Sequence, residues 1–291
     1  PSDTTSSVSQ VRNFSVKKQH PPSDTTSSVS HVRTPSALVR AVLAMGVTAH
    51  EVQELATLST GSLVSIPRKV VTVQLTLAAL RVNVSGDIVE CGTFTGGTAA
   101  IILRTLQLAS AKCQTANSVC GRQRSFWGAD SFQGLPAPVA MDHQHKPKPS
   151  QVGGLPVAGA IKGYSGQFKS SRLQFDDTLK RFGVWNLTNS KVHVLEGWFS
   201  NSLPKAAVGS IAFLRLDGDL YVSTMDPLKI LYPRLQPGGF IYIDDYGSFQ
   251  GCRNAVDKYR GQHNITTPMI SVKEGSGVFE AVWWQKSLVT G

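Results

Sequence analysis

Two acidic clusters that follow apolar runs are the residues of this sequence best suited to chemistry. Each cluster directly follows a run of strand length: Asp217 and Asp219 after the first, Asp244 and Asp245 after the second. One helix-length segment separates the runs, so we expect two neighbouring parallel strands with all four carboxylates at their carboxyl edge. Crowded carboxylates repel one another, and a hard divalent cation such as Mg²⁺ relieves that repulsion. The pattern therefore favours a metal site over four solvated turn residues.

A second functional pattern lies between the first predicted strand and the helix that follows it. There Glu90 and Gly92 are followed by Gly96 and Gly97. Glycines let the backbone approach a ligand closely, and the start of a helix faces that ligand. The spacing differs from the G-x-G-x-x-G fingerprint, which argues against a dinucleotide such as NAD. Asp130, at the end of the second predicted strand, is placed to bind ribose hydroxyls, so the pattern predicts a nucleoside site.

The elements that must position these residues alternate along the chain. We expect strands at 87–91, 126–129, 192–195, 211–216 and 240–243, and a closing antiparallel hairpin of 270–272 and 278–284. We expect helices at 97–108, 168–182, 224–235 and 252–262, with a turn at 236–239 and with Pro227 in the first turn of its helix. This alternation predicts an α/β fold with a doubly wound sheet.

A polar insertion over 136–163 interrupts the alternation between the second and third strands. Its histidines, His143 and His145, are candidates for contacts to a substrate, although histidines in loops are more often solvated.

The residues before the main domain, which we place at 86–291, divide into two segments. Residues 1–36 are rich in Ser and Thr and contain a near-duplicate, 1–9 and 22–30, so we predict a disordered tail. The helical periodicity of 37–85 predicts an extension of two or three helices, which would act as a lid or as a contact within a homodimer. Because the chain begins with Pro, we expect a true start or a targeting segment to be missing.

Composition disfavours several classes of protein. Of the 291 residues 41% are hydrophobic, enough for a large core, but no run approaches the roughly 18 apolar residues of a membrane span. The net charge is +10, yet the basic residues are dispersed, and this pattern argues against a nucleic-acid partner. A Cys-x-x-Cys pair is absent from the sequence, which argues against a zinc site.

The four cysteines carry an expectation about location. Cys91 and Cys252 are expected to be buried and reduced. Cys113 and Cys120 flank a loop and could pair only in an oxidising compartment. We expect a cytoplasmic protein.

Five blocks of the sequence together resemble the macrocin O-methyltransferase family. They are 90–97, 130–136, 196–199, 216–225 and 238–247, within a resemblance that extends over about residues 60–285. The resemblance implies a seven-stranded, Rossmann-like methyltransferase sheet at 86–291. It also implies a metal-dependent enzyme that moves a methyl group from S-adenosylmethionine to a sugar hydroxyl of an antibiotic.

Two departures from the family pattern affect the expected ligand contacts. The family has an aromatic-Arg-Gly-Gly arrangement where this chain has Phe94, Thr95, Gly96 and Gly97, so contacts to the methionine end of the cofactor would differ. The segment 137–163 matches poorly, and contacts to the acceptor would lie there.

Carried over residue by residue, the resemblance assigns roles within the site. Asp217, Asp244 and Asp245 become the Mg²⁺ ligands, and Asp219 becomes the general base for the acceptor hydroxyl. Side chains two apart on a strand share a face, which would let Asp217 and Asp219 address one hydroxyl. The expected partner is a small-molecule glycoside. The expected contacts to S-adenosylmethionine are Glu90, Gly92, Thr93, Gly96, Asp130, Ser131, Gly197 and Trp198.

Three other functions remain open on these residues. A catechol-type metal-dependent methyltransferase has a similar topology and metal site, so only the substrate differs. An RNA methyltransferase would account for the positive charge, but the sequence lacks an Asn-Pro-Pro-Tyr-type block. A non-catalytic protein that binds S-adenosylmethionine is disfavoured because all four aspartates are retained.

Overall fold

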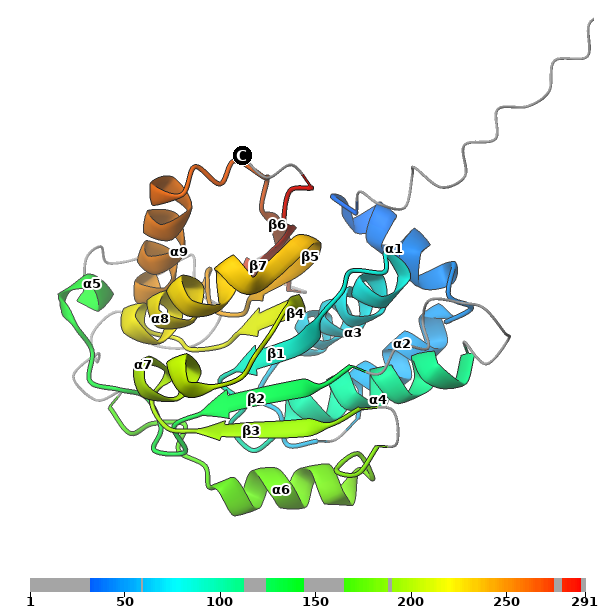
Figure 1. The fold of residues 1–291 in the computed structure, drawn as a ribbon, viewed down its shortest axis with the longest axis horizontal. Coiled ribbons are helices and arrows are strands. Elements are labelled where there is room, and N and C mark those ends of the chain that lie inside the picture. Colours follow the sequence, from blue (N-terminus) through cyan, green and yellow to red (C-terminus); the bar gives the residue numbers. More distant parts are fainter. Residues whose placement is uncertain are drawn as a thin grey trace, which may run out of the picture.

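A seven-stranded mixed sheet forms the centre of the protein (Figure 1). The computed structural model describes residues 32–58, 60–112, 124–143, 165–187, 190–274 and 279–288. The strand order is β3-β2-β1-β4-β5-β7-β6, with β1 to β5 parallel and the hairpin β6–β7 antiparallel. The predicted doubly wound sheet with a terminal hairpin is confirmed. The order reverses between β1 and β4, the position at which such sheets bind ligands.

The strands coincide with the apolar runs of the sequence. Their bounds are Asp87–Cys91 for β1, Phe126–Asp130 for β2, Val192–Glu196 for β3, Ile211–Leu216 for β4, Leu235–Ile243 for β5, Ile270–Lys273 for β6 and Phe279–Gln285 for β7. The expected strands are thus all present, and β5 alone differs clearly in where it begins.

The predicted turn at 236–239 lies inside β5. The N–H of Gly238 donates to the carbonyl oxygen of Lys286 at 3.0 Å, and the N–H of Lys286 donates to that of Gly239 at 2.8 Å. The backbone groups of this segment therefore find hydrogen-bond partners in the chain just beyond β7. The register with β4 nonetheless breaks here, because Ile211 pairs with Leu235 and Phe213 with Phe240, and Gly238 has a φ of +80°. The predicted turn is therefore present as an irregularity within β5 and not as a loop before it.

Helices cover both faces of the sheet. Their bounds are Pro35–Leu43 for α1, Ala49–Ala56 for α2, Ile66–Arg81 for α3, Gly97–Lys112 for α4, Ala140–His143 for α5, Arg172–Arg181 for α6, Phe199–Ser202 for α7, Tyr221–Leu231 for α8 and Gln250–Gln262 for α9. Helices α3, α4 and α6 pack on one face, and α7, α8 and α9 pack on the other (Figure 1).

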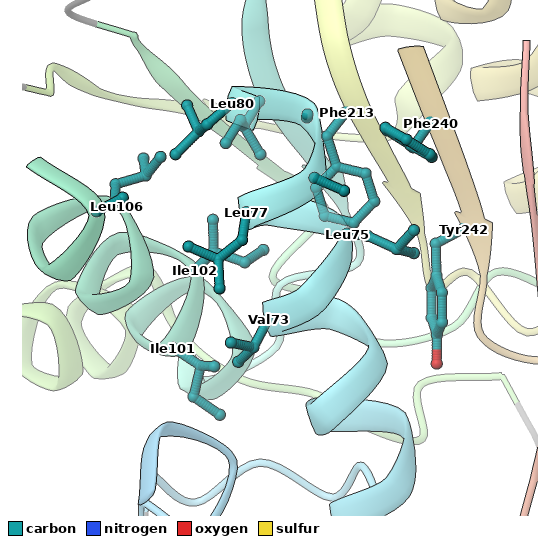
Figure 2. Packing of buried hydrophobic residues seen from close by; sticks show 14 of the residues in the cluster. Val73, Leu75, Leu77, Leu80, Ile101, Ile102, Leu106, Phe213, Phe240 and Tyr242 are labelled. Atoms are coloured by element: carbon teal, nitrogen blue, oxygen red, sulfur yellow. The ribbon is translucent and has the colours of Figure 1, made fainter. Parts of the chain in front are cut away.

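Each face of the sheet has its own apolar layer, because side chains along a strand alternate between faces. On β4, for example, Phe213 belongs to one layer and Leu214 to the other. Figure 2 shows the first layer, in which α3 packs beside α4 and against β4 and β5. Val73 of α3 meets Ile101 of α4, and Leu75 points toward Tyr242 of β5. This packing fixes α3 against the strands whose ends carry the acidic clusters.

The N-terminal extension contains the three helices α1, α2 and α3, as predicted. Part of the segment that we predicted to be a disordered tail is packed against the domain, however. Val32 is buried, and its N–H donates to Oε1 of Gln285 at 2.8 Å. The tail boundary at residue 36 is therefore corrected to an earlier position, and the predicted disorder of residues 1–31 lies outside the described residues.

Two helices begin at positions other than those expected. Helix α6 begins after Ser171 rather than near 168, because Ser171 and Gln174 form a reciprocal capping box. Helix α8 begins at Tyr221, so Pro227 lies inside the helix and not in its first turn. Pro227 has no N–H, which leaves the carbonyl of Ser223 without its usual donor four residues on.

Cys91 and Cys252 are free and buried, as predicted. Cys113, Cys120 and His145 lie outside the described residues, as does most of the predicted insertion. Within the part of the chain that the structure describes, none of the helices combines the length and the apolar character that crossing a membrane requires.

Candidate active site

A cavity of about 600 Å³ opens at the carboxyl ends of β1, β2, β4 and β5. Its walls are the turns after these strands and the start of α3 from the N-terminal extension. The volume is within the range of small-molecule sites, roughly 300–1,000 Å³. The switch point of the sheet therefore carries a pocket large enough for a cofactor and part of an acceptor.

Most of the predicted site residues line this cavity. They are Gly92, Thr93, Asp130, Ser131, Trp198, Asp217, Asp219, Asp244 and Asp245. Glu90, Gly96 and Gly197 do not line it, so their contacts to a cofactor stay predictions. Glu90 is fully buried, and burial raises its pKa to about 8 although Arg215 opposes that shift.

The glycines after β1 are required by packing as well as by ligand approach. Gly92 has a φ of +88°, and a Cβ atom there would lie 1.7 Å from the carbonyl oxygen of Asp217. A side chain at this position would displace the turn after β4. Gly96 has a φ of +84°, and a Cβ atom there would lie 2.9 Å from the ring of Phe175 on α6. Gly96 thus serves helix packing in this structure.

Asp130 is held rigidly at the edge of the cavity. Its Oδ2 accepts the N–H of Phe94 at 2.8 Å, and its Oδ1 accepts the N–H of Phe132 at 2.8 Å. Burial raises the pKa of Asp130, and the backbone hydrogen bonds oppose that shift.

The three predicted metal-ligating carboxylates converge. Each of Asp217, Asp244 and Asp245 offers an oxygen, and these atoms all lie within 4.8 Å of one another. Burial and then the charge of Asp244 raise the pKa of Asp217, while burial and then Asp219 raise that of Asp245. A nearby cation stabilises carboxylates whose charged form is disfavoured in this way. A set of close carboxylate oxygens fits a hard divalent ion such as Mg²⁺.

Arg215, on β4, ties three acidic residues together beneath the cavity. Its side chain is 0% exposed, and Nη1 contacts Oε1 of Glu90 at 3.1 Å and Oδ2 of Asp217 at 2.8 Å. Nη2 contacts Oδ1 of Asp244 at 2.9 Å. The planar guanidinium thereby sets the relative positions of the ends of β1, β4 and β5. Arg215 was not among the predicted site residues, although a cation within an apolar run was the available signal.

Arg68, in the first turn of α3, is a second residue that the sequence patterns missed. Its Nη1 contacts Oδ2 of Asp244 at 2.7 Å, and its Nη2 contacts Oε2 of Glu280 on β7 at 2.9 Å. Its Nε lies 3.3 Å from Oε1 of Glu274. The helix dipole disfavours a cation at this end of a helix, which was the signal that could have identified it.

Asp219 lies in a tight turn rather than on a strand. β4 ends at Leu216, and Asp219 has a φ of +59°, which is uncommon outside glycine. The N–H of Asp219 donates to Oδ2 of Asp245 at 3.2 Å. Burial, followed by the charges of Asp217 and Asp244, raises its pKa well above the ordinary value. The expectation that strand alternation places Asp217 and Asp219 on one face was wrong, since a left-handed turn positions them.

The mouth of the cavity is apolar. Leu63, Phe168 and Val222 line it and are also large exposed hydrophobic residues. Leu63 precedes α3 in the N-terminal extension, so this segment forms part of the wall.

Comparison with known proteins decides the family. A family model described as macrocin O-methyltransferase (TylF) matches residues 68–286, which is more than half of the chain. The chain belongs to the macrocin O-methyltransferase family. This confirms the resemblance carried by the five sequence blocks, and O-methyl transfer is the reaction class of the family.

Curated relatives of this chain are O-methyltransferases, which agrees with the assignment to the macrocin O-methyltransferase family. The 8-demethyl-8-(2,3-dimethoxy-alpha-L-rhamnosyl)-tetracenomycin-C 4′-O-methyltransferase of Streptomyces olivaceus is 38% identical over 197 residues, covering 68% of this chain and 66% of the relative. The demethyldecarbamoylnovobiocin O-methyltransferase of Streptomyces niveus is 35% identical over 206 residues, covering 70% of this chain and 68% of the relative. The matches thus span about two thirds of these relatives.

A solved structure supports the fold of this family member. The O-methyltransferase NovP is 30% identical, with a TM-score of 0.60, and the match covers 77% of this chain and 81% of NovP.

Proposed function

We propose that this protein transfers a methyl group from S-adenosylmethionine to a sugar hydroxyl of a small-molecule glycoside, with Mg²⁺ at the acidic cluster. One observation carries the proposal. The carboxylates of Asp217, Asp244 and Asp245 lie within 4.8 Å of one another, and Asp219 and Asp130 line the same cavity. A cation site, a candidate base and a candidate nucleoside site therefore share one pocket.

The cofactor fits the turn after β1 and the end of β2. Thr93 lines the cavity, and its buried Oγ1 has no hydrogen-bond partner among the described residues. A ligand atom would satisfy it, because buried hydroxyls are rarely left unpaired. Asp130 would bind the ribose hydroxyls, and Gly92 would let the backbone approach the cofactor.

The residues beside the metal site would divide the remaining work. Bound at Asp217, Asp244 and Asp245, Mg²⁺ would supply Lewis acidity that makes an acceptor hydroxyl more acidic. The carboxylate of Asp219 would accept the proton from that hydroxyl. The walls of the cavity would hold the acceptor oxygen in line with the sulfonium methyl group, so that no covalent enzyme intermediate is needed.

Three observations favour a glycoside as the acceptor. The mouth formed by Leu63, Phe168 and Val222 suits an apolar group attached to the sugar. Among the described residues that line the cavity, Arg68 is the only cation, and three carboxylates already contact it. A sugar that carries a diphosphate would therefore find charge compensation in these walls only from the proposed Mg²⁺. The names of the relatives from Streptomyces olivaceus and Micromonospora griseorubida, the second a mycinamicin III 3″-O-methyltransferase, likewise specify natural products.

Methyl transfer from S-adenosylmethionine to a panel of glycosides and catechols tests this proposal. We expect turnover on a glycoside, its loss in excess chelator, and its return with Mg²⁺ or another hard divalent cation. Mass spectrometry of the product identifies the methylated oxygen. Binding of S-adenosylmethionine, measured by calorimetry in chelator, controls for unfolding. Full turnover in chelator would remove the metal from the proposal, and turnover on catechols alone would favour the catechol-type function.

Replacement of Asp130 by Ala tests the cofactor site. We expect binding of S-adenosylmethionine to weaken by about 1.5–3 kcal/mol, since hydrogen bonds to a charged group are lost. Asp226→Ala is the matched control, because Asp226 lines the same cavity from α8. Calorimetry measures both variants. Equal affinity of the Asp130 variant and the natural protein would contradict the assignment.

A further inference from the structure

We propose that Asp142 is a positioning residue that clamps the turn bearing Asp219 to the described first part of the insertion. Asp142 lies in α5, shortly after Leu135 and Pro136, which line the cavity. The inference concerns how the site is held together, and it rests on the proposed function for the role of Asp219.

The carboxylate of Asp142 caps α8 from outside that helix. Its Oδ1 accepts the N–H of Tyr221 at 2.7 Å, and its Oδ2 accepts the N–H of Val139 at 2.8 Å. Tyr221 is the first residue of α8, whose own N-cap, Leu220, makes no side-chain hydrogen bond to the helix. Asp142 is only 4% exposed, so water can replace these two hydrogen bonds only to a small extent. A negative charge at the start of a helix is also favoured by the helix dipole.

The first turn of α9 leaves room for this carboxylate. A Cβ atom on Gly251 would lie 1.7 Å from Oδ1 of Asp142 and 2.8 Å from the backbone nitrogen of Tyr221. Asn254, one turn further along α9, donates from Nδ2 to the carbonyl oxygen of Met141 at 2.7 Å. Helix α5 is thus fastened to α9 by one contact and to α8 by another. Figure 1 shows α5 beside α8 and α9.

The turn between β4 and α8 needs such restraints, because Asp219 has a left-handed backbone that a non-glycine residue adopts at a cost. On one side the N–H of Asp219 is bound by Asp245, and on the other the N–H of Tyr221 is bound by Asp142. Within the turn, the N–H of Leu220 donates to the carbonyl oxygen of Gly218 at 2.6 Å. Release of Tyr221 would let the turn relax and would move the Asp219 carboxylate from its place in the cavity.

Comparison of Asp142→Ala with Asn254→Ala tests the clamp. Both variants remove a contact of α5, but only the first frees the N–H of Tyr221. We expect Asp142→Ala to lower kcat about ten- to hundredfold, the scale of a small misplacement, with Mg²⁺ and S-adenosylmethionine affinities unchanged. Asn254→Ala should keep kcat and alter at most the KM for the acceptor. Equal losses of kcat in the two variants would show that Asp142 merely holds the insertion, and overturn the proposal.

A second pair of variants perturbs the clamp from α9. Alanine normally stabilises a helix when it replaces glycine. At Gly261, also in α9, nothing lies within 4 Å of the added Cβ atom, so Gly261→Ala should retain full turnover. Gly251→Ala should displace the Asp142 carboxylate and reproduce the loss of kcat. Full turnover of a folded Gly251→Ala variant would count against the proposal.

Amide hydrogen exchange tests the contact between Asp142 and the Tyr221 N–H without any measurement of turnover. We expect the Tyr221 amide to exchange faster in Asp142→Ala than in Asn254→Ala or the natural protein. Unchanged exchange would overturn the clamp whatever the kinetics show, and faster exchange with an unchanged kcat would overturn its role in positioning Asp219. Failure of the natural protein to methylate any glycoside counts against the proposed function, and is distinguished from failure of the clamp by this measurement.

Discussion

Replacement of Asp219 by Asn is expected to lower kcat by about 10²–10⁴-fold while leaving Mg²⁺ and S-adenosylmethionine binding nearly intact. An amide has the same shape as the carboxylate but does not accept the proton of the acceptor hydroxyl. The backbone N–H of Asp219, which donates to Asp245, is unchanged by the substitution, so the turn keeps this contact. Steady-state kinetics with saturating Mg²⁺ and cofactor measure the loss, and calorimetry measures the two affinities.

The predicted metal ligands should respond differently from Asp219 to the same substitution. Asp217→Asn, Asp244→Asn and Asp245→Asn should each weaken Mg²⁺ binding, since a neutral amide is a poorer ligand for a hard cation. Asp226→Asn changes a carboxylate in the same cavity outside the acidic cluster and should behave like the natural protein. If Asp219→Asn loses the metal as severely as Asp217→Asn, the roles are wrongly divided. If it retains full turnover, Asp219 is not the base.

Replacement of Arg215 by Met is expected to lower the free energy of unfolding by about 3–5 kcal/mol. The variant keeps most of the side-chain volume but leaves Glu90, Asp217 and Asp244 without the buried cation that joins them. Asp244 would keep its contact with Arg68, but Glu90 and Asp217 would lose the cation that neutralises them. Urea unfolding measures the loss, and chelator in the buffer prevents a bound metal ion from replacing the missing charge.

Two controls separate the buried network from a general loss of charge. Arg172→Met removes an arginine whose side chain is 37% exposed and pairs with Asp176, and we expect a change below about 1 kcal/mol. The double variant Glu90→Gln with Arg215→Met should recover part of the stability, because an amide at position 90 stays uncharged once its cation partner is gone. A loss for Arg215→Met as small as that for Arg172→Met would show that the network contributes little to folding.

The local patterns of the sequence determined most of the architecture. Apolar runs of strand length, separated by helix-length segments, were enough to predict a parallel sheet. Because parallel strands end at a common edge, the acidic residues after β4 and β5 had to come together there. The predictions for Asp130 and for the aspartates after β4 and β5 rested on this short-range regularity, and all of these residues line one cavity.

Only the tertiary structure decided how those carboxylates are held. Arg68 contacts Asp244 across 176 residues, and Asp142 contacts Tyr221 across 79. No local period relates residues so far apart, since such contacts depend on how helices and loops pack over the finished sheet. The same holds for Gly92, whose missing side chain makes room for the carbonyl of Asp217. The sequence thus determined which chemical groups reach the edge of the sheet, whereas long-range packing decided their partners, because burial and charge pairing arise only between elements already in place.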